Sequence, residues 1–117
     1  MINYINSKLK LHNLIKKLNR NNIFYLRLEH IFGKNDRENK FLPNLVQKLK
    51  NEETIVLNDP FTIRDFTPID HVVNCCLILR DTNFKNNILN IGTGTPQLTL
   101  SFIYKLINFY KIDNPVL

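Results

Sequence analysis

The stretch that decides how this chain is organised stands near its start and reads Tyr4-Ile5-Asn6-Ser7-Lys8. From Ile5 to Leu18 apolar residues recur at helical spacing with lysines between them, which predicts a helix over residues 5–18. Residues four apart on a helix share one face, so the Lys8 ammonium lies near the Tyr4 phenol. A nearby cation eases proton exchange by a phenol, and the pair is therefore a candidate acid/base device.

This spacing alone leaves two interpretations open. A tyrosine and a lysine four apart also occur on lysine-rich amphipathic helices whose polar face is simply solvated. The chain has 117 residues, of which 44% are hydrophobic and 22% are charged, so it has the composition of one globular domain. Its net charge of +6 suits an anionic ligand, either a nucleic acid or a nucleotide diphosphate. Alternatively, the lysines only cover faces that are exposed to solvent.

The segments that follow predict an α/β fold. After a polar turn at residues 19–22, the apolar run Ile23–Leu28 is typical of a buried strand. A helix, a tight turn and such a strand form the second half of a βαβ unit, so we expect this strand to be parallel to one that precedes the helix, and no such strand stands in the sequence.

Further along, helical and strand patterns alternate. We predict a loop at 33–40, helices over 41–49, 71–79 and 98–110, and strands over 54–57 and 88–91. Asp70 is expected to cap the helix over 71–79, which is apolar nearly all round and should be buried.

Cys75 and Cys76 are adjacent in an apolar run, a poor arrangement for a disulfide or a metal site, so we expect them to pack as small hydrophobes and expect no metal. Met1 is not followed by a signal-peptide pattern, and no apolar run approaches the length of a membrane helix. We therefore expect a cytoplasmic protein.

Three more motifs follow the opening pair in a fixed order: the run from Tyr25 to Gly33, then Arg64-Asp65-Phe66 with Asp70 after it, then Asn90-Ile91-Gly92-Thr93-Gly94. In this order the chain, from about Tyr4 to Tyr110, resembles the C-terminal part of the extended short-chain dehydrogenase/reductases. These are the NAD-dependent epimerase/dehydratase family of nucleotide-sugar enzymes. The Glu29-His30 step before Gly33 is similar to a subgroup that includes CDP-abequose and CDP-paratose synthases.

The resemblance implies a fold. Residues 1–117 would form a single partial domain, made of the last strands of a Rossmann-type parallel sheet and a small substrate-binding α/β portion. The N-terminal cofactor-binding half would be absent. Three explanations stay open: a shortened or disrupted gene product, a sequence that begins late, or one half of a split protein.

The resemblance also implies roles for four residues. Tyr4 would be the catalytic acid/base, and Lys8 would bind the nicotinamide ribose of NAD or NADP. His30, where the family most often has Asn, and Arg64 would bind the sugar nucleotide, with the Arg64 guanidinium on the diphosphate. The Ser or Thr that the family carries before this helix has no counterpart among the three residues that precede Tyr4.

Each of these residues also has a structural alternative. His30 could be a partly buried histidine bonded to backbone, and Arg64 could form a surface ion pair with Asp65. Asp65 and Asp70 are expected to hold the loop and start the helix rather than to touch substrate. The Gly92-Thr93-Gly94 turn lacks the third glycine and the downstream acid of a dinucleotide fingerprint, so we expect an ordinary turn there.

Together these features predict part of an NAD(P)-dependent nucleotide-sugar epimerase, dehydratase or ketoreductase that is inactive as an isolated chain. Its partners would be a nucleotide-diphosphate sugar and either a second copy of the chain or a complementing N-terminal half. The alternative is a small basic module that binds nucleic acid or a protein, although the lysines are scattered over several helices rather than gathered on one face.

Overall fold

A computed structural model of the chain describes residues 2–18, 20, 23–82 and 88–113. The predicted helices and the strands around residues 25 and 90 are confirmed, with the first helix beginning earlier than expected. In chain order the elements are α1 (Ile2–Leu18), β1 (Tyr25–Leu28), β2 (Ile31–Phe32), α2 (Phe41–Lys50), β3 (Ile63–Arg64), β4 (Thr67–Pro68), α3 (Ile69–Arg80), β5 (Ile88–Ile91), β6 (Gln97–Leu98) and α4 (Thr99–Tyr110).

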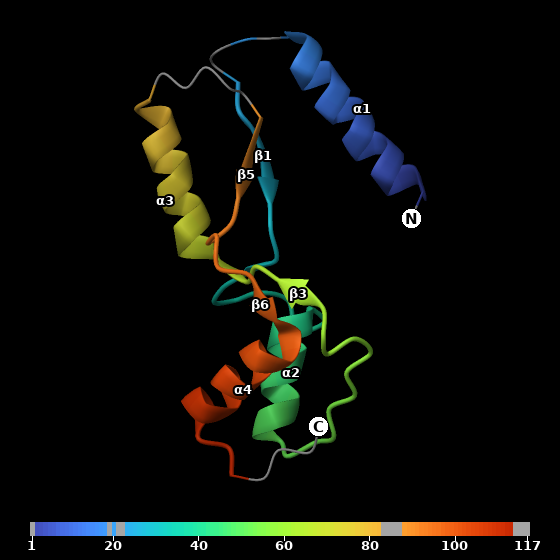
Figure 1. The fold of residues 1–117 in the computed structure, drawn as a ribbon, viewed down its shortest axis with the longest axis vertical. Coiled ribbons are helices and arrows are strands. Elements are labelled where there is room, and N and C mark those ends of the chain that lie inside the picture. The colour runs from blue at the N-terminus through green and yellow to red at the C-terminus, as the bar shows by residue number, and fades with distance from the viewer. Residues whose placement is uncertain (1, 19, 21–22, 83–87, 114–117) are drawn as a thin grey trace.

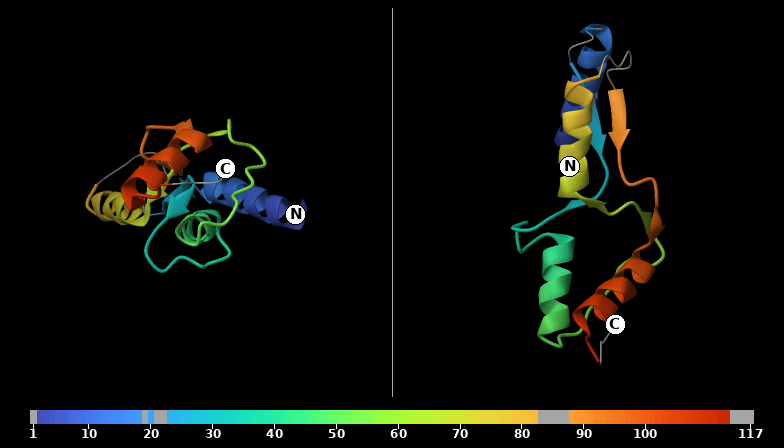
Figure 2. Two further views of the ribbon diagram at one scale, coloured as in Figure 1. Left: turned by 90° about the horizontal axis from the view of Figure 1, so that it is seen from below. Right: turned by 90° about the vertical axis from the view of Figure 1, so that its left-hand side faces the viewer.

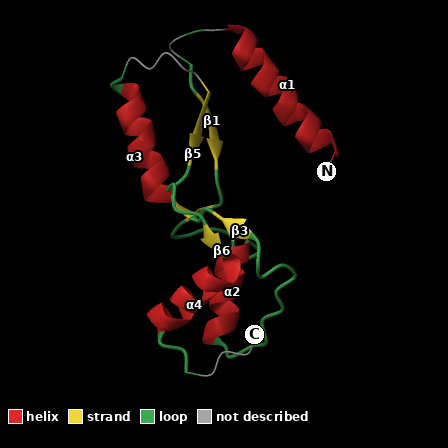
Figure 3. Cartoon of the chain, viewed as in Figure 1, coloured by secondary structure: helices red, strands yellow, loops and turns green. Residues whose placement is uncertain are grey.

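The strands form three two-stranded pairs (Figure 3). β1 and β5 are parallel, with Tyr25 opposite Ile88 and Leu28 opposite Ile91. β2 and β4 are also parallel, whereas β3 and β6 are antiparallel. The parallel partner of β1 therefore comes later in the chain, and the α1 helix is not part of a βαβ unit within the described residues.

The chain is elongated, with extents of 53 × 34 × 24 Å. Helices α1 and α3 and the β1–β5 pair lie at one end, and α2, α4 and the β3–β6 pair lie at the other (Figure 1). The hydrophobic core sits at the second end, where α2 and α4 pack together (Figure 2). Its buried members are Leu45, Leu49, Ile55, Ile103 and Ile107.

The predicted strand over residues 54–57 is wrong. Ile55 is buried in the core and Val56 is exposed, which reproduces the alternation of a strand. A strand also needs a hydrogen-bonded neighbour, and no strand in the described part of the chain pairs with this segment. It runs as an extended loop against the helices.

Helix α3 differs from its prediction in two ways. It begins at Ile69 after Pro68, whose extended backbone makes it the residue before the helix, so Asp70 lies in the first turn and is not the cap. The expectation of a buried helix is also wrong, because only Val72 and Leu79 are buried. Both cysteines are free, with Cys75 half-buried and Cys76 exposed, so the expected packing fails for Cys76.

Helix α1 contains no buried residue, although its apolar side chains recur at helical spacing. Its exposed apolar residues include Ile2, Ile5, Leu9, Leu11, Leu14 and Leu18. No helix in the described ranges is long and apolar enough to span a lipid bilayer.

Candidate functional site

A cavity of about 700 Å³ lies where the two ends of the molecule meet. Its wall is formed by the start of α1, the end of β1, the whole of β2 and the loop into α2. The lining residues are Tyr4, Leu28, Glu29, His30, Ile31, Phe32, Gly33, Lys34, Asn35, Asp36, Lys40, Phe41, Leu42 and Ile69. Two of the four residues singled out from the sequence, Tyr4 and His30, therefore border one space.

Tyr4 and Lys8 lie on the same side of α1, as their spacing predicted. The Lys8 Nζ is 5.3 Å from the centre of the Tyr4 ring, a cation–π distance. The Tyr4 side chain is 66% exposed, so its hydroxyl can reach a ligand in the cavity. The Ser7 hydroxyl donates to the Tyr4 carbonyl at 2.7 Å, a bond that stays inside the helix.

A polar contact and a ring contact join α1 to strand β1. The Arg27 Nη2 lies 3.2 Å from both ring nitrogens of His12, and the His12 and Tyr25 rings are 5.9 Å apart between centres. Because α1 contains no buried residue, these contacts help to position the helix beside β1.

His30, on the cavity wall, is held by contacts of its backbone and of its ring. Its carbonyl accepts a hydrogen bond of 3.0 Å from the Thr67 N–H, and the next residue pairs with Thr67 in the β2–β4 ladder. Its ring lies 6.1 Å from that of Phe66, which in turn stacks on Phe102 at 4.0 Å. The alternative of a histidine bonded to backbone through its ring is wrong, because the side chain is exposed and its Nε2 lies 2.9 Å from the Arg64 Nη1.

Arg64 stands on β3 and contacts His30 rather than an acid. The predicted alternative, an ion pair with Asp65, is wrong: among the described residues no carboxylate lies within ion-pairing distance of Arg64. The imidazole accepts one N–H of the guanidinium, which has five. Arg64 does not line the cavity itself, but it keeps its charge and most of its donors next to His30, which does.

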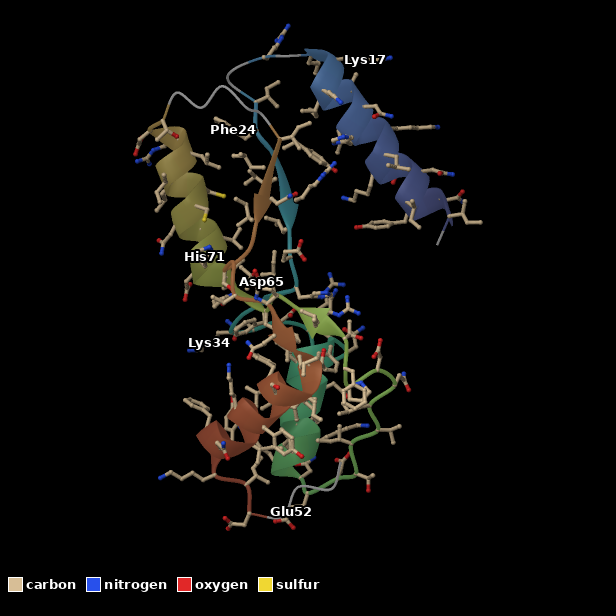
Figure 4. The ribbon with its side chains drawn as sticks, viewed as in Figure 1. Lys17, Phe24, Lys34, Glu52, Asp65 and His71 are labelled. Atoms are coloured by element: carbon tan, nitrogen blue, oxygen red, sulfur yellow. The ribbon has the colours of Figure 1, made fainter. Side chains whose placement is uncertain are left out.

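Asp65 was expected to hold a loop, and the structure shows that it holds the distant turn at residues 92–94, which the sequence did not indicate. It accepts hydrogen bonds from the Thr93 hydroxyl at 2.6 Å and from the Gly94 N–H at 2.9 Å. A Cβ on Gly92 would come within 2.6 Å of the Asp65 Oδ2 and displace it, and Gly94 has φ of +73°, where a side chain strains the backbone, so glycine suits both positions. Asp65 and His71 meet at this turn, since the His71 Nε2 lies 3.0 Å from the Gly92 carbonyl (Figure 4).

Asp65 should make stability depend on pH. Partial burial raises the pKa of its carboxyl, but hydrogen bonds from Thr93, Gly94 and Thr67 outweigh this and leave the pKa below its ordinary value. The carboxylate therefore stabilises the fold above about pH 4, and this contribution is lost as the pH falls through the folded-state pKa. We expect Asp65→Asn to lower the free energy of unfolding by about 1–3 kcal/mol at pH 7.

Urea denaturation of both proteins at pH 7 and at pH 3 measures this difference, which should shrink at the lower pH. Asp59→Asn, in an exposed loop, is the matched control and should change stability little at either pH. An equal loss for Asp65→Asn at both values would show that the carboxylate charge is not what holds the turn.

Some site features were not predicted from the sequence. Lys34 and Lys40 lie on the cavity wall, where Glu29 and Asp36 balance their charge, although the stretch that holds the lysines was interpreted only as a loop. The stack of Phe66 on Phe102, which supports His30, joins residues from distant segments.

A second hollow of about 950 Å³ lies between α2, α4 and the start of α3. Within the described ranges no group of His, Cys, Asp or Glu could hold a metal ion.

Comparison with curated proteins supports a specific family. The chain is 32% identical over 83 residues to CDP-abequose synthase of Salmonella muenchen, and the match covers 70% of this chain and 28% of that protein. CDP-abequose synthase of Salmonella typhimurium strain LT2 is 32% identical over 87 residues, covering 71% of this chain and 29% of that protein. The chain thus spans less than a third of the length of these relatives.

Solved structures agree on the fold. TunA, an NAD-dependent NDP-hexosamine 5,6-dehydratase of tunicamycin biosynthesis, has a TM-score of 0.78 at 23% identity, over 97% of this chain and 39% of that one. UDP-glucose 4-epimerase of Thermotoga maritima, solved with UDP-glucose, has a TM-score of 0.66 at 22% identity, over 78% and 31%. The α/β fold is therefore a fragment of the Rossmann fold of the short-chain dehydrogenases/reductases.

The sequence model of the family described as "NAD dependent epimerase/dehydratase family" matches residues 2–92, which include the opening helix, the cavity wall and the turn at residues 92–94. The predicted resemblance is thereby confirmed. The chain belongs to the NAD-dependent epimerase/dehydratase family.

Proposed function

We propose that this chain is the substrate-handling part of an NAD(P)-dependent nucleotide-sugar epimerase, dehydratase or ketoreductase, and that it is inactive on its own. The observation that carries the proposal is the shared cavity. Tyr4 lines this cavity, and the Lys8 ammonium lies against the Tyr4 ring. His30 also lines the cavity, and its imidazole accepts a hydrogen bond from Arg64. A candidate acid/base group thus borders the same space of about 700 Å³ as the histidine that contacts the Arg64 guanidinium.

Tyr4 supplies the proton chemistry in this proposal. Oxidising an alcohol needs a base for the hydroxyl proton, and reducing a ketone needs the same group as an acid. A phenol exposed to the cavity serves both directions, and the Lys8 ammonium stabilises the negative charge that the phenol carries after giving up its proton. Tyr4 and Lys8 thus move and hold the proton at the reacting sugar oxygen.

The residues present fit only one end of the cofactor. When bound, the nicotinamide gives or accepts the hydride that balances the proton on Tyr4. Tyr4 and Lys8 are exposed and adjacent, so they suit the hydroxyls of the nicotinamide ribose. The turn at residues 92–94 is unsuited to the pyrophosphate, because Asp65 already accepts the Gly94 N–H and would repel an anion there.

Arg64 binds the diphosphate of the substrate in this proposal. A guanidinium can donate to two phosphate oxygens at once, and such charge-assisted bonds contribute about 1.5–3 kcal/mol each. On the cavity wall the charges of Lys34 and Lys40 are matched by those of Glu29 and Asp36, so Arg64 is the cation on which this role depends. The CDP and UDP of the relatives' names place a diphosphate next to the sugar, which makes UDP and CDP suitable probes.

Equilibrium dialysis of the whole chain against UDP, CDP and NAD tests the proposal. We expect saturable binding of at least one nucleotide diphosphate, with a Kd of about 10 μM to 1 mM, and no measurable binding of NAD in that range. Micromolar NAD binding would contradict the proposal that this chain binds the substrate but cannot bind the cofactor on its own. Tight, salt-sensitive binding of DNA or RNA without diphosphate binding would favour the basic module instead.

A further inference from the structure

We propose that His30 is a positioning residue for Arg64: its neutral imidazole, which lines the cavity, holds the neighbouring guanidinium in place with the positive charge intact. This inference rests on the proposed function of Arg64 and names the group that prepares it for the diphosphate. The link is the hydrogen bond of 2.9 Å from the Arg64 Nη1 to the His30 Nε2.

The two partners differ in how firmly they are held. The His30 backbone is anchored to Thr67 and its ring lies against Phe66, which is itself stacked on Phe102. Arg64 is exposed and stands on a strand of only two residues, and its long side chain has several rotatable bonds. The fixed imidazole therefore orders the mobile guanidinium, and ordering before binding reduces the entropy cost of binding a ligand.

The chemistry of the acceptor matters as much as its position. A carboxylate in place of His30 would cancel the charge on Arg64 and compete with phosphate for its donors. Asp65, the adjacent acid, is engaged by Thr93 and Gly94 on the other side. A neutral imidazole takes one N–H and leaves the remaining donors and the full charge for an anion.

Three variants, each measured by equilibrium dialysis with UDP on the whole chain, test this role. Arg64→Ala is expected to weaken UDP binding about 10- to 100-fold, because charge-assisted bonds are lost. His30→Leu is expected to weaken it about 3- to 10-fold, because only the ordering of Arg64 is lost. His30→Gln should remain within about twofold of wild type, since its amide oxygen can accept in place of Nε2.

A double-variant cycle separates positioning from direct contact. If His30 acts only through Arg64, His30→Leu should have no effect in the Arg64→Ala background. Arg80→Ala, at the far end of α3 and ion-paired with Asp81, is the matched control for removing one exposed arginine. Urea denaturation of each variant checks folding, and His30→Asn, whose shorter amide does not reach Arg64, repeats the test with a polar residue.

The outcomes distinguish two failures. If His30→Leu leaves UDP binding unchanged while Arg64→Ala weakens it, the positioning role is overturned and the proposed function stands. An equal loss from His30→Leu with and without Arg64 would also overturn it, in favour of a direct contact. Absence of UDP binding by the wild-type chain, or no effect of Arg64→Ala, would overturn the proposed function and this inference together.

Discussion

Tyr4→Phe is expected to lower the turnover number of an active assembly containing this chain by about 100- to 10,000-fold, with little change in folding. The substitution removes only the hydroxyl, which is the group proposed to exchange a proton with the sugar. The side chain is 66% exposed on a helix without buried residues, so its loss disturbs no packing. The effect should therefore fall on turnover rather than on stability.

The assembly for this test is the chain combined with a cofactor-binding segment of the same family, as a fusion or as two chains. Steady-state hydride transfer, followed by nicotinamide absorbance, measures turnover. Tyr104→Phe makes the same change at a similarly exposed tyrosine on α4, outside the lining of the cavity, and should leave turnover unchanged. Equal turnover for Tyr4→Phe and Tyr104→Phe would show that the Tyr4 hydroxyl takes no part in the reaction.

The isolated chain is expected to associate rather than to remain a monomer of 13.8 kDa. Among the described residues the parallel β1–β5 pair has no third strand, whereas parallel sheets are normally covered on both faces and extended by neighbours. Helices α1 and α3 also leave apolar side chains in solvent, with Leu9 at 53%, Leu14 at 54% and Ile78 at 61% exposure. Exposed apolar side chains of this kind promote association when they gather in patches.

Sedimentation velocity over a range of concentrations measures this association. Replacing Leu9 and Leu14 together by Gln should lower the association constant by at least about tenfold, because each buried leucine contributes roughly 1.5–3 kcal/mol. Phe61→Gln is the control, since Phe61 is 70% exposed but lies in a loop away from α1. A monodisperse monomer with a sharp cooperative melt would contradict the expectation.

Local patterns predicted most of the elements of this fold. The helices α1, α2 and α4 and the strands β1 and β5 stand where apolar periodicity indicated them, because these signals depend on neighbouring residues. Residues 54–57 failed because a strand requires a partner, which no local pattern supplies. The burial of α3 failed for the same kind of reason: an apolar helix is buried only if other elements cover it.

In the candidate site, too, local sequence predicted contacts within one element but not contacts between distant segments. The spacing of Tyr4 and Lys8 on one helix predicted their contact, because four residues make about one turn. The contact of Arg64 with His30, 34 residues away, depends on how β2, β3 and β4 are arranged, and sequence spacing carries no information on that. Sequence alone had allowed Arg64 to pair with the adjacent Asp65, which instead holds the turn 29 residues away.

We expect the cavity bordered by Tyr4 and His30 to bind a nucleotide diphosphate. A crystal structure of the chain with UDP would show this binding. The diphosphate should lie within hydrogen-bond distance of the Arg64 guanidinium, with the distal phosphate directed toward Tyr4. UDP bound instead in the hollow between α2 and α4, with Arg64 still contacting only His30, would contradict it.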